Sequence, residues 1–345
     1  MKRTNIFIIA GIFFVVFSYF FIEILVPLPT DNEKKEIEIP KGTTFRQALE
    51  IFSQEGFLRD KNVLLLFGRI SGIERRIRAG YYSVNGPVSP LDIFKMLKEG
   101  RIIEYDITIV EGDSLMEIGE KLSELKIISQ DDFKELSTDK NLLYVHDIDA
   151  PSIEGYLFPD TYKLPKGISP EDAIGMMINR MREKFTSELC ERASEIGFSE
   201  REVLTLASII EKESVTDKER FLISAVFHNR LKKGIPLQAD PTAIYGIKSS
   251  KEKITASDLR KKTKYNTYVI KGLPPGPIAS PSIKSIEAAL YPPDVPYIYF
   301  VSNNDGTHLF SVTAEEHTVA VKSYRKKKLR EEQETQREAQ KDERS

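Results

Sequence analysis

The stretch "LASIIEKES", residues 206–214, reads as a helix with a carboxylate inside its apolar pattern. The helical neighbours of Glu211 at three and four positions are small or short: Ala207, Ser208, Ser214 and Val215. A carboxylate in an apolar setting is costly unless it is paired or used. Small neighbours leave room for another group against Glu211, so this residue is the first candidate for chemistry.

Helices are expected on both sides of this stretch. Ser199 is a candidate N-cap, and Glu202 three residues later completes a capping box. We therefore expect a helix over residues 199–213, preceded by a helical segment over residues 170–196 and followed by one over Asp217–Lys233. Glu211 would then lie near the end of the central helix.

The chain after these helices alternates between loops and short elements. Up to residue 281 it is long, irregular and rich in turn residues, and long loops inside a domain tend to be functional. A short helix over Ile283–Leu290 and a β-hairpin with its turn at residues 304–306 should follow. Residues 326–345 form a charged and polar tail, expected to be an extended helix end or disordered.

The N-terminus carries a candidate membrane anchor. Lys2 and Arg3 precede an uncharged run over residues 4–22, which is about long enough to cross a ~30 Å hydrocarbon core. The basic residues come first, so residues 1–4 should stay in the cytoplasm and residues 5–26 should span the membrane. A cleaved signal peptide is the alternative, but no small-residue cleavage site follows the run. We therefore expect a single-pass protein of the cytoplasmic (inner) membrane whose remaining chain lies outside the cytoplasm.

Two segments of the N-terminal half share one pattern. The segments that begin at Ile37 and Ile107 both alternate like a strand, turn at a glycine, and continue into an apolar helical stripe and a second short helix. Between them lie a further strand, a Gly/Pro turn and a helix. Residues 36–102 resemble the LysM-like modules of cell-wall proteins, and a generic β-α-α spacer domain fits the same pattern. Residues 103–145 form the second small strand-helix unit.

Composition excludes several classes of function. The 345 residues carry a net charge of −2, so no basic excess points to nucleic acid as a partner. A single cysteine, Cys190, allows no internal disulfide. The four histidines are scattered, with no HExxH and no Cys/His cluster, so we expect neither a metal site nor a cofactor.

These observations predict an α+β protein. It would comprise a transmembrane helix, a small LysM-like α/β module, a larger mixed α+β catalytic domain over residues 103–325, and the charged tail. The candidate glutamate lies in the larger domain, so the chemistry is expected there.

Five motifs then point to one family. "EGYLFPDTY", "LASIIEKES", "FHNRLKKGIPLQADPTAIYG", "YNTYVIKGLPPGPIASPS" and "PYIYFV…GTHLFS…EEH" occur in this order. Together they closely resemble the endolytic murein transglycosylases, the MltG (YceG-like) family, from the anchor to about residue 325. Two features depart from the family pattern: "ASPS" replaces a Gly-containing turn, and the first strand-helix unit is weakly patterned. Neither departure is expected to touch Glu211.

The resemblance implies that Glu211 is a single general acid/base. An ordinary glycosidase uses two carboxylates, whereas a lytic transglycosylase can use one. The glutamate protonates the leaving oxygen of the MurNAc-GlcNAc β-1,4 bond, the muramyl C6 hydroxyl attacks C1, and a 1,6-anhydro-MurNAc end forms. Apolar neighbours would favour the protonated acid that this step needs. The implied partners are nascent peptidoglycan glycan strands and the membrane peptidoglycan synthases that make them.

Further residues are candidates for substrate binding. The side chains of Gln238 and Asn266 lie in polar loops, where they are expected to bond sugar hydroxyls or N-acetyl groups. The tyrosines expected to stack on sugar rings are Tyr156, Tyr245, Tyr265 and Tyr268. The structural alternatives are that the amides hold the loops in shape and that the tyrosines pack in the core.

Other carboxylates keep competing functions open. Asp240 is a candidate second carboxylate of a true hydrolase, although a turn or cap role before Pro241 fits as well. Glu213 lies on another helix face, where a salt bridge to Arg220 is expected. A non-catalytic cell-wall-binding protein that works through its LysM-like module is the third possibility.

Glu211 also has a purely structural alternative. In that interpretation it is a buried carboxylate paired with a basic residue of the following helix, Arg230 or Lys233.

Overall fold

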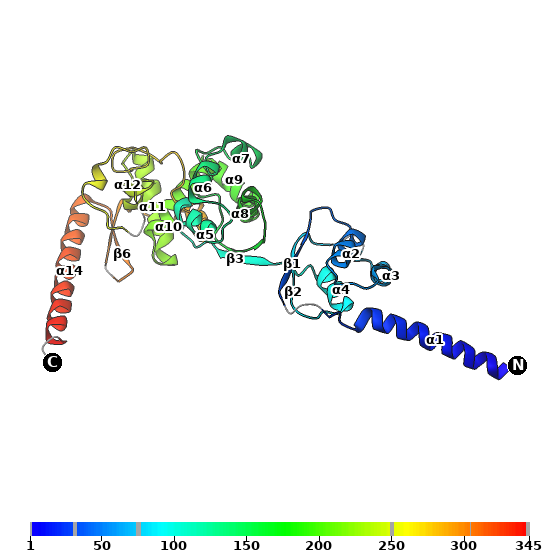
Figure 1. Cartoon of the computed structure of the whole chain (residues 1–345). Helices are drawn as coiled ribbons and strands as arrows, with labels where there is room; N and C mark the ends of the chain where they lie inside the picture. The colour runs from blue at the N-terminus through cyan, green and yellow to red at the C-terminus, as the bar shows by residue number, and fades with distance from the viewer. Residues whose placement is uncertain (1, 30–32, 74–76, 249–251, 304, 343–345) are drawn as a thin grey trace. The chain divides into compact units, whose positions relative to one another are not determined.

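The computed structural model of the chain describes residues 2–29, 33–73, 77–248, 252–303 and 305–342. The chain divides into two compact units: unit 1 comprises residues 1–106 and 163–168, and unit 2 comprises residues 107–162 and 169–345. The chain passes between them along β3 (Glu104–Thr108) and β4 (Thr161–Pro165), which form a two-stranded sheet. Helices dominate, and the described strands form three two-stranded sheets (Figure 1). The expected α+β class is confirmed.

Unit 1 begins with the predicted apolar helix. The helix α1 runs over Lys2–Leu25, and its segment Phe7–Leu25 has a mean hydropathy of 2.5. Nineteen residues of this composition are long and apolar enough to cross a membrane. The sequence-based prediction of one N-terminal apolar helix is therefore confirmed.

The rest of unit 1 is a small module of helices on a two-stranded sheet. Its elements are β1 (Lys35–Ile39), α2 (Phe45–Gln54), α3 (Lys61–Ser71), β2 (Gly80–Val84) and α4 (Pro90–Glu99). The two strands pair antiparallel, with Ile37 opposite Tyr82. The strand-turn-helix prediction for β2 and α4 is confirmed, whereas the likeness to LysM modules stays a prediction.

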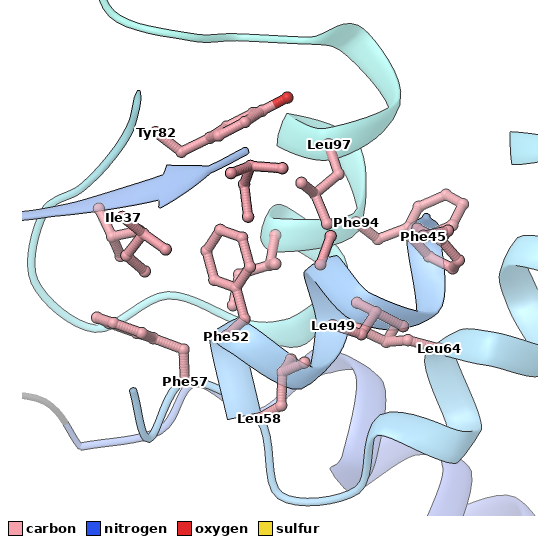
Figure 2. Packing of buried hydrophobic residues seen from close by; sticks show 14 of the residues in the cluster. Ile37, Phe45, Leu49, Phe52, Phe57, Leu58, Leu64, Tyr82, Phe94 and Leu97 are labelled. Carbon is pink, nitrogen blue, oxygen red and sulfur yellow. The ribbon is translucent and has the colours of Figure 1, made fainter. Parts of the chain in front are cut away.

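The module has a core of its own. Side chains from all five elements meet there, and Figure 2 labels ten of them: Ile37, Phe45, Leu49, Phe52, Phe57, Leu58, Leu64, Tyr82, Phe94 and Leu97. The ring of Phe52 makes edge contacts with Phe57 and Tyr82, with centroids 6.4 Å apart in each pair. The Tyr82 hydroxyl donates to the carbonyl of Arg78, so its polar end is satisfied.

Unit 2 contains the remaining helices and a hairpin. Its helices are α5 (Leu115–Glu124), α6 (Gln130–Leu136), α7 (Lys140–Val145), α8 (Pro170–Lys184), α9 (Ser187–Glu195), α10 (Glu200–Glu213), α11 (Asp217–Lys233), α12 (Asp240–Ile244), η2 (Asp258–Arg260), α13 (Ile283–Leu290) and α14 (Ala314–Asp342). The expected helical segment over residues 170–196 is in fact two helices. Phe185 leaves the helical conformation with ψ 77°, and Thr186 occupies the N-cap position of α9 without a side-chain capping hydrogen bond.

Helix α10 carries Glu211 and packs against α11 and α13. Its predicted capping box is confirmed: Ser199 Oγ accepts from the Glu202 N–H, and the Glu202 carboxylate accepts from the Ser199 N–H. From Val203 to Ile210 every residue of α10 is buried. The helix is therefore held rigidly up to the turn that bears Glu211.

The predicted hairpin is also confirmed. Strands β5 (Tyr299–Ser302) and β6 (His308–Ser311) pair antiparallel, and Asn304 of the predicted turn lies outside the described residues. His308 ties the hairpin to α11, because its N–H and its Nδ1 lie 2.7 and 2.9 Å from the two carboxylate oxygens of Glu219. The tail continues as α14, which agrees with the helical alternative for that segment.

Candidate active site

Both carboxylate oxygens of Glu211 are held by donors from other elements. Arg220 Nη2, at the start of α11, donates to Oε1 over 3.0 Å. The Ser282 backbone N–H donates to Oε2 over 2.9 Å, and the Ser282 hydroxyl donates to the same oxygen. Ser282 is the N-cap of α13, so the carboxylate also lies at the N-terminus of that helix, where negative charge is favoured.

The pairing of Glu211 differs from what the sequence predicted. The expected partners were Arg230 or Lys233, and the observed partner is Arg220. Three residues separate α10 from α11, so the first turn of α11 lies beside the last turn of α10. The side chains of Glu211 and Arg220 are each 6% exposed. The predicted salt bridge between Glu213 and Arg220 is also wrong, because Arg220 pairs with Glu211 instead.

Arg220 is the centre of a small network. Its Nε donates to Ser214 Oγ over 3.1 Å, and its Nη1 donates to Asp217 Oδ1 over 2.8 Å. Lys284 of α13 pairs with the other oxygen of Asp217. The guanidinium therefore has a fixed position, and it fixes Glu211 in turn.

Arg230 contacts backbone carbonyls and not Glu211. Its Nε donates to the carbonyl of Ile298, and its Nη1 donates to the carbonyls of Pro236 and Leu237. It anchors the loop after α11 to the residue that precedes β5, which is a structural role.

A groove of about 610 Å³ opens beside Glu211. Its lining comprises residues 108–111, residues 159–161 of the "EGYLFPDTY" motif, and Ser214, Val215 and Arg220. The first two of these segments lie side by side, because the Ile109 N–H donates to the Asp160 carbonyl over 3.0 Å. We call this feature the Glu211 groove.

A turn and a loop position Ser282. The Gly112 N–H donates to the Ser280 carbonyl over 2.8 Å, and the Ser280 N–H donates to the Asp113 carbonyl over 2.7 Å. The loop is also tied to α10, because the Ile278 N–H donates to Ser208 Oγ over 3.0 Å. Ser208 is one of the small neighbours of Glu211, so part of the predicted space is filled by this loop.

The motif "ASPS" ends at Ser282. We expected this departure from the family pattern to leave Glu211 untouched, and that expectation is wrong. Pro281 and Ser282 lead into α13, and α13 packs on α10. The departure therefore lies in direct contact with the candidate catalytic residue.

The two predicted amide residues do not occur among the described residues that line the Glu211 groove. Gln238 is exposed, and its backbone has a positive φ of 52°. Its Oε1 accepts from Arg230 Nη1 over 3.2 Å. Asn266 is 0% exposed; its Nδ2 donates to the carbonyls of Leu259 and Lys261, and its Oδ1 accepts from the Tyr268 N–H. The geometry of Asn266 fits the structural alternative, while that of Gln238 leaves its side chain open to a ligand.

The predicted tyrosines occupy three different settings. Tyr156 is buried in the core of unit 2, with the guanidinium of Arg182 5.8 Å from its ring centre. Tyr265 packs against Tyr245 with centroids 4.6 Å apart. Tyr268 donates its hydroxyl to Asp240 Oδ1. Among the described residues that line the Glu211 groove, none of the predicted tyrosines occurs.

Glu213 and Asp240 form a separate pair of carboxyls. Burial raises the pKa of Glu213 to about 8, and the negative charge of Asp240 adds to this shift while its backbone N–H opposes it. Asp240 is exposed and lies at the start of α12. Two residues along a helix turn a side chain to another face, so this pair is distinct from Glu211.

Glu154 was missed as a candidate. It is 1% exposed, and burial raises its pKa to about 7. Its carboxyl accepts from the Leu115 N–H at the start of α5 and from the Tyr245 hydroxyl. It lines a second cavity, of about 660 Å³, together with Lys212 and Ile278. Glu154 lies in a turn without periodicity, and its place at the start of a quoted motif was the only available signal.

Comparison with known proteins assigns the chain to a family. The model of the YceG-like family matches residues 37–323. The chain belongs to the YceG-like family. The resemblance inferred from the five motifs is thereby confirmed.

Relatives with established names agree with this assignment. A Bacillus subtilis (strain 168) protein named endolytic murein transglycosylase is 31% identical over 322 residues, which cover 87% of this chain and 88% of that protein. A Streptococcus pneumoniae (serotype 2, strain D39) protein of the same name is 27% identical, and the match covers 91% of this chain and 63% of that protein. The crystal structure of a YceG-like protein from Listeria monocytogenes has a TM-score of 0.58 and 30% identity, covering 83% of this chain and 98% of that one.

Proposed function

We propose that this chain is a membrane-anchored endolytic murein transglycosylase that uses Glu211 as its single general acid/base. The observation that carries the proposal is the carboxylate of Glu211, held at both oxygens by Arg220 and Ser282 at the side of an open groove. The names of the relatives supply the substrate class, peptidoglycan.

The proposed reaction moves one proton out and one proton back. Glu211 gives its proton to the oxygen that joins C1 of MurNAc to the next GlcNAc, and the C1–O bond breaks. The C6 hydroxyl of the same MurNAc attacks C1 and passes its proton to the Glu211 carboxylate. The products are a GlcNAc hydroxyl and a 1,6-anhydro-MurNAc end, and no water is consumed.

Arg220 and Ser282 serve this reaction by positioning. Their hydrogen bonds fix both oxygens of Glu211, and misplacement of a catalytic group by ~1 Å can cost about 10²-fold in rate. They also stabilise the carboxylate that exists after the proton has been given away.

Product analysis tests the proposal. Purified glycan strands digested with the full chain should yield anhydromuramyl ends, each lighter by one water than a reducing end in mass spectra. A true hydrolase would yield reducing ends, and a wall-binding protein would leave the strands intact. Asp240 is the candidate second carboxylate of a true hydrolase. It lies at the start of α12, where it accepts from the Tyr268 hydroxyl, and it is not among the described residues that line the Glu211 groove.

The proposed location is the cytoplasmic (inner) membrane. The apolar helix α1 supports a single span with the remaining chain outside the cytoplasm. Nascent glycan strands are made at that membrane, so peptidoglycan synthases are the proposed protein partners. Sequencing the N-terminus of the mature protein from membranes tests the anchor, because an N-terminus beyond Pro29 would mean that the helix is removed.

A further inference from the structure

Helix α3 exposes an apolar patch on the surface of unit 1. The residues of this α3 patch are Leu66, Phe67 and Ile70, with exposed fractions of 50%, 41% and 80%. The other side of α3 is committed to the module core through Leu64 and Gly68. Three large apolar side chains gathered within two turns of one helix are unfavourable in water unless something covers them.

The start of α3 is fixed beside the end of α1. Arg59 donates to the carbonyls of Val26 and Pro27 over 2.9 and 3.2 Å. The hydroxyl of Tyr19 donates to Asp60 over 3.1 Å, and Asp60 is the N-cap of α3. Helices α3 and α4 both contact α1. These contacts lie within unit 1 and join the start of α3 to the last turns of the apolar helix and the residues that follow it.

The contact with Tyr19 shows where the start of α3 lies along the apolar helix α1. Tyr19 precedes Leu25, the end of the apolar run, by six residues. At about 1.5 Å of rise per residue this is about 9 Å of helix. The N-cap of α3 therefore lies alongside the last turns of the apolar run and not beyond them. The α3 patch begins at Leu66, six residues or about 9 Å of helix from this N-cap, which keeps it within reach of lipid headgroups.

We propose that the α3 patch docks on the lipid–water interface of the bilayer that α1 crosses, so that unit 1 has a second membrane contact besides its span. The proposal rests on the proposed anchoring of α1. Its physical basis is the division of α3 into a face buried in the module, an apolar exposed face, and polar positions such as Asn62 and Ser71.

A second copy of the chain is a weaker occupant for the α3 patch. A stable protein interface buries about 800 Å² on each partner. Three side chains on one helix supply only part of that area, whereas a bilayer interface accepts a patch of any size. Membrane docking is also continuous with α1, which already brings the patch to the lipid.

The chain offers a clean probe because it contains no tryptophan. Full-length Ile70→Trp protein is reconstituted into phosphatidylcholine–phosphatidylglycerol vesicles, either plain or with brominated acyl chains that quench tryptophan on contact. Phe13→Trp in α1 reports the span, and Tyr144→Trp reports a residue of unit 2 that is 86% exposed. Leu66→Trp repeats the measurement if Ile70→Trp fails to fold.

The expected result is an emission shift to shorter wavelength for Ile70→Trp and at least half the quenching by brominated lipid that Phe13→Trp shows. Tyr144→Trp should be quenched by aqueous iodide and not by the lipid. If Phe13→Trp is quenched by lipid while Ile70→Trp behaves like Tyr144→Trp, the docking proposal is overturned and the anchor stands. If Phe13→Trp escapes lipid quenching, the anchor itself fails, and the proposal fails with it. A blue-shifted, lipid-insensitive Ile70→Trp that changes with protein concentration would assign the patch to a second copy instead.

Discussion

Ser282 donates both its backbone N–H and its hydroxyl to one carboxylate oxygen of Glu211, a residue 71 positions earlier in the chain. The same serine caps α13, accepting from the Ser285 N–H. One residue thus joins the start of a helix to the candidate acid. The stability of α13 and the orientation of Glu211 are coupled through it.

Replacing Glu211 by Gln should abolish cleavage and leave the fold intact. Gln keeps the shape but cannot give and retake a proton, and general acid/base help is typically worth ~10²–10⁴-fold in rate. Cleavage rates and thermal melts on the same sample measure both effects. Glu213→Gln is the matched control, because Glu213 lies two residues away on another helix face. A Glu211→Gln variant that keeps more than about a tenth of the wild-type rate would remove Glu211 from the mechanism.

Ser282→Ala should lower the cleavage rate about tenfold and cost about 1 kcal/mol of stability. The rate falls because a hydrogen bond to a charged group is lost, and stability falls because α13 loses its N-cap. Ser282→Thr keeps the hydroxyl and should restore both properties. Ser285→Ala is the control on the same helix, since Ser285 Oγ has no hydrogen-bond partner among the described residues. Equal rates for the Ala and Thr variants at position 282 would show that the hydroxyl does not position Glu211.

Stability should fall as pH rises from about 4.5 to about 7 because of Glu154. Burial raises the pKa of its carboxyl from 4.5 to about 7 in the folded chain. In this window the unfolded chain has lost the proton and the folded chain still holds it, so each rise in pH favours unfolding. The stabilisation is complete below about 4.5, and the loss at about 7 is on the order of 3 kcal/mol.

Denaturant melts at several pH values measure this loss. Glu154→Gln cannot ionise and should flatten the slope between pH 4.5 and 7 while keeping acceptors for the Leu115 N–H and the Tyr245 hydroxyl. Glu213 contributes in the same direction up to about pH 8, where its pKa lies. An unchanged slope in the Glu154→Gln variant would mean that Glu154 is already ionised in the folded chain.

Local sequence rules predicted the elements that local interactions determine. The capping box of Ser199 and Glu202, the apolar helix α1 and the hairpin of β5 and β6 all follow from residues within a few positions of each other. The position of Glu211 near the end of the central helix was predictable in the same way, from the Ser199 cap and the apolar pattern that follows it. The break at Phe185 was not, because an aromatic residue before a Ser/Thr cap does not by itself end a helix.

The surroundings of Glu211 depend on contacts far apart in sequence. Arg220 and Ser282 reach it only because α11 and α13 pack on α10, and helical periodicity does not state which helices pack together. The small residues around Glu211 suggested space for a ligand, yet Ser208 receives the backbone of the loop at Ile278. Glu154 escaped notice for a related reason, since its burial comes from α5 and Tyr245 and not from its own segment.

Asn266→Ala and Gln238→Ala should behave differently, although both residues were predicted from sequence to bind substrate. Asn266 is buried, and its amide serves the carbonyls of Leu259 and Lys261, so its loss leaves buried acceptors unpaired. Such a loss costs about 1–3 kcal/mol, and activity should fall only as far as the folded fraction falls.

Gln238 gives the opposite expectation. Its side chain is exposed and makes one hydrogen bond with Arg230, so truncation should change the melting temperature little. If Gln238 contacts the glycan, its Ala variant loses cleavage rate at full stability. Thermal melts and initial rates on the two variants decide between the roles. A stable Asn266→Ala variant with a large loss of rate would restore Asn266 as a substrate contact. A Gln238→Ala variant with normal rate and stability would remove Gln238 from the site.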